Sequence, residues 1–221
     1  MILYGSTISP FVRKTLAFAT EKGLTLEVVP AGMGRGGPDF VEASPFGKMP
    51  GFRDPGADEG GGDFTISDSS AIVQYLEAKH PEPNLIPADP ANRARAIWYE
   101  EFADTIVMKM GGAIFFNRLV APKFMNQPGN EDAAAAAERD DLPPILDYLE
   151  RTIPAEGCLV AGRLTLADLA VASPFVNLSH VGIAIDATRY PRTAGYIAAI
   201  LARPSFAPVI AAEQAFLAKL G

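Results

Sequence analysis

A proline-rich segment near the middle of the chain separates two regions with different hydrophobic patterns. This segment reads PEPNLIPADP and spans residues 81–90. Before it, short apolar runs alternate with turns rich in Gly and Pro, as in a mixture of short strands and helices. After it, apolar residues recur at helical spacing over long stretches. We therefore expect an N-terminal domain at 1–80, a linker at 81–90 and an all-helical domain at 91–221.

The N-terminal region predicts a small α/β domain. Ser9 is a residue type that begins helices, Pro10 suits the first helical position, and Gly23 suits the end of the same helix. A later helix is predicted at 67–80, where apolar residues share one face, and 55–62 is a flexible acidic, Gly-rich insert. The predicted strands are 2–4, 24–30, 49–54 and 63–66, with a loop and at most one short helix at 32–48.

The C-terminal region predicts helices throughout. In the first of them, at 92–120, large apolar side chains recur at a spacing of four from Trp98 to Ile114. In the next, at 131–153, Pro143 and Pro144 must break or kink the helix. Further helical patterns follow at 164–183, 191–203 and 204–220.

Composition excludes several classes of function. The net charge of −7 and the lack of a Lys/Arg cluster argue against a nucleic-acid partner. No run of about 18 apolar residues is present, so no membrane partner is expected. The single cysteine, Cys158, cannot form an internal disulfide, and two histidines leave few ligands for a zinc or iron site. We expect a cytoplasmic protein without a metal cofactor.

Three short motifs carry residues that suit either a structural or a ligand-binding role. Pro50 opens a strand, and an X-Pro bond there can be cis, which exposes the preceding backbone to a ligand. Asp68 and Ser69 stand at a helix start, where they cap the helix or, with its N–H groups, hold a carboxylate. Thr165 and Asp168 have the spacing of a capping box, which we interpret as purely structural.

Five motifs, SPFVRK, KMPGF, SDSSAI, LTLADLAVAS and ARPSF, together resemble the cytosolic glutathione transferase superfamily in order and approximate spacing. The chain resembles its serine-type, bacterial-like members over nearly its whole length. The resemblance implies a thioredoxin-like domain followed by an all-helical domain, and an enzyme that uses glutathione as cosubstrate. It also implies a cis bond before Pro50 and a homodimer, because the family usually dimerises.

The resemblance also assigns roles to individual residues of the first domain. It implies that the Ser9 hydroxyl donates a hydrogen bond to the glutathione sulfur. The backbone of Met49, just before Pro50, pairs with the cysteinyl part of glutathione. The two ends of glutathione are assigned to three further residues, Lys48 for the glycyl carboxylate and Asp68 with Ser69 for the γ-glutamyl end.

The second substrate of such an enzyme is a small hydrophobic electrophile. We expect its binding wall to combine Phe11 from the first domain with Trp98, Phe102 and Ile106 from the second. The three residues of the second domain also suit an ordinary helix-bundle core. The sequence does not identify the electrophile.

Several alternatives remain open at this stage. Tyr4 could replace Ser9 as the sulfur's donor but falls within a strand and suits the core, and Ser6 and Thr7 lie in the same loop. The activity could be that of a glutathione-dependent isomerase or peroxidase, or the chain could be a non-catalytic binding module. A thiol-disulfide reductase is disfavoured because Cys158 lies in the helical region.

The two histidines and the cysteine suit structural roles better than catalytic ones. His80 precedes Pro81 and suits the C-terminal cap of a helix. His180 lies near a helix end with no obvious partner in the sequence. Cys158 suits a small buried side chain rather than a reactive thiol.

Overall fold

The computed structural model describes residues 1–32, 36–155 and 157–220. The chain divides into two compact units, Met1–Leu85 and Ile86–Gly221. The division falls inside segment 81–90, the linker predicted from its prolines. Part of the predicted loop at 32–48, residues 33–35, lies outside the described residues.

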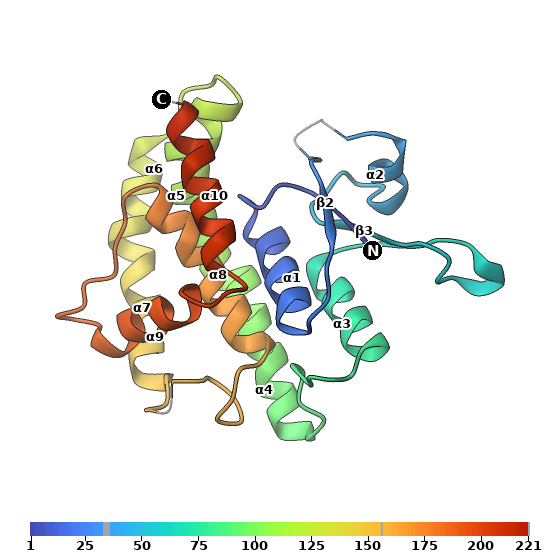
Figure 1. The fold of residues 1–221 in the computed structure, drawn as a ribbon. Coiled ribbons are helices and arrows are strands. Elements are labelled where there is room, and N and C mark those ends of the chain that lie inside the picture. Colours follow the sequence, from blue (N-terminus) through green and yellow to red (C-terminus); the bar gives the residue numbers. More distant parts are fainter. Residues whose placement is uncertain (33–35, 156, 221) are drawn as a thin grey trace. The chain divides into compact units, whose positions relative to one another are not determined.

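The first unit is built on a four-stranded sheet in the order β2-β1-β3-β4. Strand β1 is parallel to β2 and antiparallel to β3, and β3 is antiparallel to β4. Helices α1 and α3 pack against each other, whereas α2 contacts β3 and β4 (Figure 1). The predicted thioredoxin-like unit is confirmed. Its elements are β1 (Ile2–Tyr4), α1 (Pro10–Glu21), β2 (Glu27–Val29), α2 (Pro38–Ala43), β3 (Gly51–Asp54), β4 (Phe64–Ser67) and α3 (Ser69–Lys79), with a 3-10 turn at Glu59–Gly61.

The end of α1 explains why Leu24 does not begin a strand, although the predicted strand 24–30 starts there and β2 spans Glu27–Val29. Gly23 adopts a left-handed conformation with φ of 71° just past the helix. The N–H of the next residue, Leu24, donates to the carbonyl of Ala19 at 2.9 Å. Leu24 therefore completes the helix C-terminus and is not free to pair in the sheet, as in a Schellman-type ending.

A buried ion pair holds the last residues of the first unit in place. Lys22 Nζ lies 2.7 Å from Glu77 Oε2, and both side chains are almost fully buried. Lys22 also donates to the carbonyl of Pro83 at 2.8 Å, and Glu77 accepts from the N–H of Leu85. Hydrogen bonds from α1 and α3 thus fix the start of the proline-rich segment.

All the regular secondary structure described for the second unit is helical. Its first long helix consists of α4, a π-helical stretch, α5 and a second π-helical stretch, in that order. The two π-helical stretches, Phe102–Val107 and Phe116–Phe124, were not predicted, and they change the residue spacing on each helix face. The helices are α4 (Pro90–Glu101), α5 (Met108–Phe115), α6 (Glu131–Ala136), α7 (Leu142–Thr152), α8 (Leu166–His180), α9 (Pro191–Leu201) and α10 (Ala207–Leu217), with a π-helical stretch at Ala137–Asp141 and a 3-10 turn at Ala218–Leu220.

The two prolines at 143–144 mark a change of helix type. They lie in the first turn of α7, directly after the π-helical stretch Ala137–Asp141. Prolines are tolerated at such a position because the first N–H groups of a helix have no partner within it.

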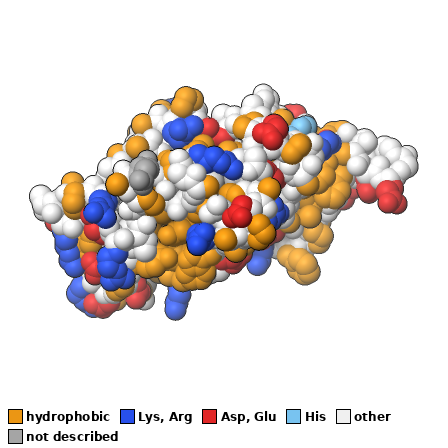
Figure 2. Space-filling view, turned by 90° about the horizontal axis from the view of Figure 1, so that it is seen from below, with side chains coloured by type: hydrophobic (Ala, Val, Ile, Leu, Met, Phe, Trp, Pro, Cys, Tyr) orange, Lys and Arg blue, Asp and Glu red, His pale blue; other side chains and the backbone are white. Residues whose placement is uncertain are grey.

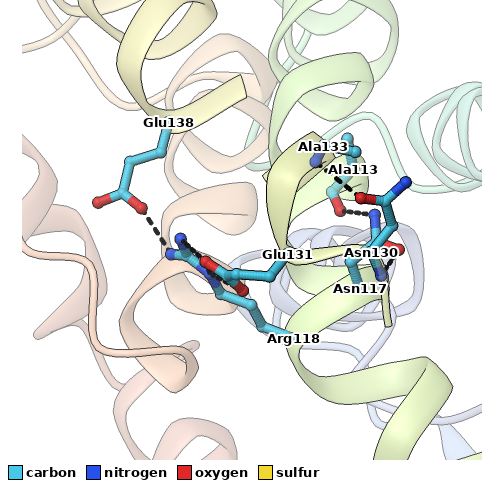
Figure 3. A network of polar contacts seen from close by, with 7 residues as sticks. All are labelled: Ala113, Asn117, Arg118, Asn130, Glu131, Ala133 and Glu138. Carbon is cyan, nitrogen blue, oxygen red and sulfur yellow. Dashed lines mark hydrogen bonds and ion pairs between the residues drawn. The ribbon is translucent and has the colours of Figure 1, made fainter. Parts of the chain in front are cut away.

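A polar network joins the second π-helical stretch to α6 and to the π-helical stretch that follows it (Figure 3). Arg118 binds Glu131 at 2.7 Å and Glu138 at 2.6 Å. The Asn117 amide donates to Ala113, and its oxygen accepts from the N–H of Asn130. All these hydrogen bonds and ion pairs join residues of the second unit, so we interpret the network as structural.

Helix α8 is the buried centre of the second unit, and its start confirms the predicted capping box. Asp168 is 0% exposed. Its carboxylate accepts from the N–H groups of Leu159 and Thr165, each at 2.8 Å, and from the Tyr196 hydroxyl at 2.9 Å. Burial raises the pKa of Asp168, and these hydrogen bonds oppose the effect.

His180, which has no obvious partner in the sequence, is paired with a glutamate in the structure. His180 Nε2 lies 2.8 Å from Glu213 Oε2, and both side chains are almost fully buried. Glu213 belongs to α10, far from His180 in the sequence, so no local pattern could reveal the pair.

No helix within the described ranges combines the length and the apolar character needed to cross a bilayer. On the face shown in Figure 2, Lys and Arg side chains are interspersed with acidic and hydrophobic ones and do not form one basic patch. This arrangement agrees with the net charge of −7.

Candidate functional site

The sheet register brings three separate segments of the first unit to one edge. Tyr4 pairs with Gly51, so the loop after β1 begins opposite Pro50. Gly51 also pairs with Ser67, so the residue after β4 likewise lies opposite Pro50. The segments 5–9, 48–50 and 68–69 each begin or end at this edge, and together they hold all the residues that we predict to bind glutathione. We call them the glutathione edge.

A cis peptide bond precedes Pro50, as predicted. The Pro50 carbonyl accepts from the N–H of Asp68 at 3.3 Å, which joins the second segment to the third. Met49 is half-buried, whereas Lys48 is exposed. The segments 48–50 and 68–69 are therefore joined by a backbone hydrogen bond.

Two glycines allow close approaches near this edge that the sequence did not reveal. A Cβ on Gly32 would fall 2.2 Å from Met49 Sδ, so Gly32 leaves room for Met49, whereas a Cβ on Gly5 would fall 2.6 Å from a methyl group of Val12 in α1. Both glycines have positive φ, 103° at Gly32 and 155° at Gly5. For Gly5, its place directly after a short strand was the available signal, because such a glycine marks a close approach of neighbouring atoms.

Helix α1 begins at the glutathione edge, with Ser9 as its N-cap residue and Pro10 in its first turn. The position is as predicted, but the Ser9 side chain makes no capping hydrogen bond. The Ser9 N–H donates to Ser6, and the Ser9 carbonyl accepts from Arg13. The backbone of Ser9 is thus used by the fold, while its hydroxyl does not cap the helix.

Helix α3 begins at the same edge and is capped differently. Asp68 has φ of 83°, and its Oδ1 accepts from the N–H groups of Ser70 at 2.8 Å and Ala71 at 3.3 Å. The capping interpretation of Asp68 is therefore confirmed. Ser69 is the first residue of the helix and is 3% exposed.

The alternative donors to Ser9 differ in their surroundings. Tyr4 is 4% exposed and packs with Phe40, so its predicted place in the core is confirmed. Burial raises the pKa of the Tyr4 phenol, while nearby Arg53 lowers it. Ser6 is exposed and Thr7 is half-buried, and both lie in the loop that leads to Ser9.

The remaining chemically active side chains lie outside the glutathione edge. His80 caps the C-terminal end of α3, as predicted, and its Nε2 is buried with no hydrogen-bond partner among the residues that the structure describes. Cys158 is half-buried. The pKa of its thiol is raised mainly by burial and to a smaller extent by the charge of Asp168. No group of three or more His, Cys, Asp or Glu side chains within the described ranges is arranged to hold a metal ion.

The four residues predicted for the second substrate belong to different units. Phe11 is half-buried on α1 of the first unit. In the second unit, Phe102 is 4% exposed, whereas Trp98 is 49% and Ile106 is 44% exposed. The Trp98 indole donates to the Tyr148 hydroxyl at 3.3 Å. The core interpretation therefore suits Phe102, while Trp98 and Ile106 keep accessible apolar surface.

The second unit also contains an apolar pocket of about 240 Å³ between α7, α8 and α9. Leu146, Phe175 and Ile197 are among its lining residues. Trp98, Phe102 and Ile106 do not line it. This pocket is therefore not the predicted electrophile wall.

Comparison with known proteins gives matches in both units. Residues 3–84 match the family model "Glutathione S-transferase, N-terminal domain", and residues 115–213 match "Glutathione S-transferase, C-terminal domain". A glutathione S-transferase of Hyoscyamus muticus is 29% identical, with 97% of this chain and 99% of the relative covered. An uncharacterised GST-like protein of Escherichia coli (strain K12) is 30% identical, with 94% and 96% covered.

A solved structure gives a similar result. It is a glutathione S-transferase from Methylobacterium radiotolerans in complex with glutathione sulfonate. The TM-score is 0.73 at 30% sequence identity, with 95% of this chain and 93% of that chain covered.

Proposed function

Because the chain belongs to the glutathione S-transferase family, we propose that it binds reduced glutathione at the glutathione edge and transfers it to a small hydrophobic electrophile. The observation that carries the proposal is the shared sheet edge, where α1 and α3 both begin. Glutathione has two carboxylates and reacts as a thiolate. Helix N-termini favour anions because of their unpaired N–H groups and positive dipole ends.

The proposed contacts distribute the parts of glutathione along this edge. The backbone of Met49 pairs with the cysteinyl part, and Lys48 attracts the glycyl carboxylate. Ser69 and the start of α3 hold the γ-glutamyl carboxylate. Asp68 uses Oδ1 for its cap, which leaves Oδ2 for the γ-glutamyl ammonium group.

Ser9 acts as a hydrogen-bond donor to the sulfur rather than as a base. A free thiol with a pKa of about 8.5 is only a few per cent thiolate at neutral pH. A hydroxyl donor and the N-terminus of α1 both favour the anion, so they lower the thiol pKa. Each unit of lowering corresponds to about 1.4 kcal/mol. The hydroxyl is suited to this role because it makes no capping bond.

In the second unit, the electrophile is proposed to contact Trp98 and Ile106, because Phe102 is buried in the core. The exposed fractions of Trp98 and Ile106 support this assignment, since accessible apolar surface is what a hydrophobic substrate requires. A glutathione-dependent isomerase or peroxidase would use the same thiolate and differ only in the second substrate. A cytoplasmic location stays a prediction from the single cysteine.

A homodimer is part of the proposal. Phe46 is 91% exposed and Val41 is 57% exposed, both in or near α2 of the first unit. A second copy of the chain would cover such apolar side chains. Light scattering coupled to size exclusion should give twice the mass of 23.5 kDa, and Phe46→Ser should shift the population toward the monomer.

Calorimetric titration with reduced glutathione tests the binding proposal directly. We expect a dissociation constant below about 1 mM, which corresponds to roughly 4 kcal/mol of binding free energy. A panel of aryl halides, epoxides, unsaturated carbonyls, hydroperoxides and cis-trans isomerisable acids then separates transferase from peroxidase and isomerase activity. Absence of heat at millimolar glutathione would contradict the proposal and favour a non-catalytic module.

A further inference from the structure

The four residues that precede Met49 are all exposed, from Pro45 to Lys48. Within one chain, side-chain packing therefore contributes little to their placement. The residue before them, Ser44, is 1% exposed and ends α2. A buried polar side chain at the base of an exposed turn needs a hydrogen-bond partner, and here the partner lies at the far end of the turn.

Two hydrogen bonds from Ser44 close this turn. The Ser44 hydroxyl donates to the carbonyl of Lys48 at 2.7 Å. The Ser44 carbonyl accepts from the N–H of Gly47 at 2.9 Å. Gly47 has φ of 67°, a left-handed conformation that lets the turn reverse within so few residues.

Ser44 is itself held by the core of the first unit. Its N–H donates to the carbonyl of Phe40 at 2.7 Å. Phe40 is buried with Tyr4 and Ala43 in a cluster against which Met49 packs. The buried cluster therefore sets the position of Ser44, and the Ser44 hydroxyl sets the backbone position of Lys48.

We propose that Ser44 is a positioning residue for recognition of the glycyl carboxylate of glutathione, because it holds the backbone from which Lys48 extends. This inference rests on the proposed function. The Pro50 carbonyl is held separately by the N–H of Asp68. Loss of the Ser44 hydroxyl should therefore disturb the contact at Lys48 more than the contacts to the cysteinyl and γ-glutamyl parts.

A comparison of two ligands tests this selectively. Glutathione and its monoethyl ester, esterified at the glycyl carboxyl, differ in the charge that Lys48 is proposed to bind. The parent protein should bind glutathione roughly tenfold more tightly than the ester, as expected for one charge-assisted hydrogen bond. Lys48→Met should lose most of this preference by weakening glutathione and sparing the ester.

Ser44→Ala should reduce the preference by about threefold or more, mainly through weaker glutathione binding. Ser44→Thr keeps the hydroxyl and should restore the parent preference. Ser179→Ala is the matched control, because Ser179 Oγ also donates to a backbone carbonyl at 2.7 Å but lies in the second unit. It should leave the preference unchanged.

The outcomes separate the inference from the proposed function. If the parent binds neither ligand, the proposed function fails and the inference fails with it. If the parent prefers glutathione and folded Ser44→Ala keeps that preference, the inference alone is overturned. If Ser44→Ala does not fold, Gly47→Ala perturbs the same turn through its positive φ, with open space around the added methyl. Reduced preference in that variant supports the inference, and unchanged preference overturns it.

Discussion

Two helix N-termini in this molecule use polar side chains in opposite ways. At the start of α8, Asp168 is fully buried, and all the donors described for its carboxylate belong to the second unit. At the start of α1, Ser9 occupies the N-cap position, but its hydroxyl makes no capping bond. The same sequence logic predicts a cap at both sites. The α8 carboxylate is used within its own unit, whereas the Ser9 hydroxyl is not used to cap α1 and is proposed to act as a donor to the glutathione sulfur.

Removal of the Asp168 carboxylate should give the largest effect on stability. Asp168→Ala leaves the N–H groups of Leu159 and Thr165 and the Tyr196 hydroxyl without their acceptor. Each unsatisfied buried donor costs about 1–3 kcal/mol, so the free energy of unfolding should fall by about 3 kcal/mol or more.

The control is Asp186→Ala, because Asp186 caps an exposed turn through Thr188. It should cost less than about 1 kcal/mol. Urea denaturation measures both variants. Equal losses in the two would show that burial does not distinguish the Asp168 cap.

The sequence predicts the positions of both N-termini but not their use. Ser9-Pro10 and Thr165–Asp168 are local patterns, and the structure begins helices at both. Whether a side chain is satisfied depends on residues far away in the sequence, such as Tyr196 for Asp168. The missed pair of His180 and Glu213 has the same physical reason, since it joins α8 to α10.

Other features also depend on long-range geometry. The strands at 49–54 and 63–66 were predictable from their apolar residues and flanking turns. The register that sets Pro50 opposite the loop after β1 and opposite Asp68 was not, because strand pairing is non-local. The π-helical stretch Phe102–Val107 likewise has no local signature, and within it Phe102 is buried whereas Ile106 is 44% exposed.

Replacement of Ser69 sharpens the contrast on the binding side. Ser69→Ala should weaken glutathione binding by about 10- to 150-fold, the effect of losing a hydrogen bond to a charged group. Ser70→Ala, one residue along α3, is the matched control and should bind nearly as the parent does. Calorimetry gives both constants. Indistinguishable affinities for the two variants would remove Ser69 from the proposed site.

A cap supplied by a different helix extends the comparison to pH. Glu150 on α7 accepts from the N–H groups of Arg192 and Thr193 at the start of α9, at 3.0 and 2.9 Å. Burial alone would raise the pKa of Glu150, but these hydrogen bonds lower it overall. Its stabilisation is therefore present above the unfolded-state pKa and is lost as pH falls through the lowered folded-state pKa.

Glu150→Gln should lower the free energy of unfolding by about 1 kcal/mol at pH 7. The difference from the parent should shrink as the pH is lowered from about 5 to about 3, because the parent carboxylate becomes protonated. Denaturation curves at several pH values measure this convergence. A difference that stays constant over the whole range would show that the charge of Glu150 contributes nothing.

The smallest effect on stability is expected at Ser9, together with the most specific effect on chemistry. Ser9→Ala should change the free energy of unfolding by less than about 0.5 kcal/mol, because the hydroxyl makes no capping bond. A loss nearer the typical capping value of about 1 kcal/mol would show that the hydroxyl caps α1 in solution.

The pKa of bound glutathione tests the contrast between the two N-termini most directly. Titration of thiolate absorbance near about 240 nm in the binary complex gives this pKa for the parent and for Ser9→Ala. Loss of one hydrogen bond to the anion should raise the pKa by about one unit, with a corresponding fall in turnover at neutral pH and little change in glutathione affinity. An unchanged pKa and turnover would contradict the assignment of Ser9 as the sulfur's donor and would return Ser6, Thr7 or a backbone N–H of the same loop to consideration.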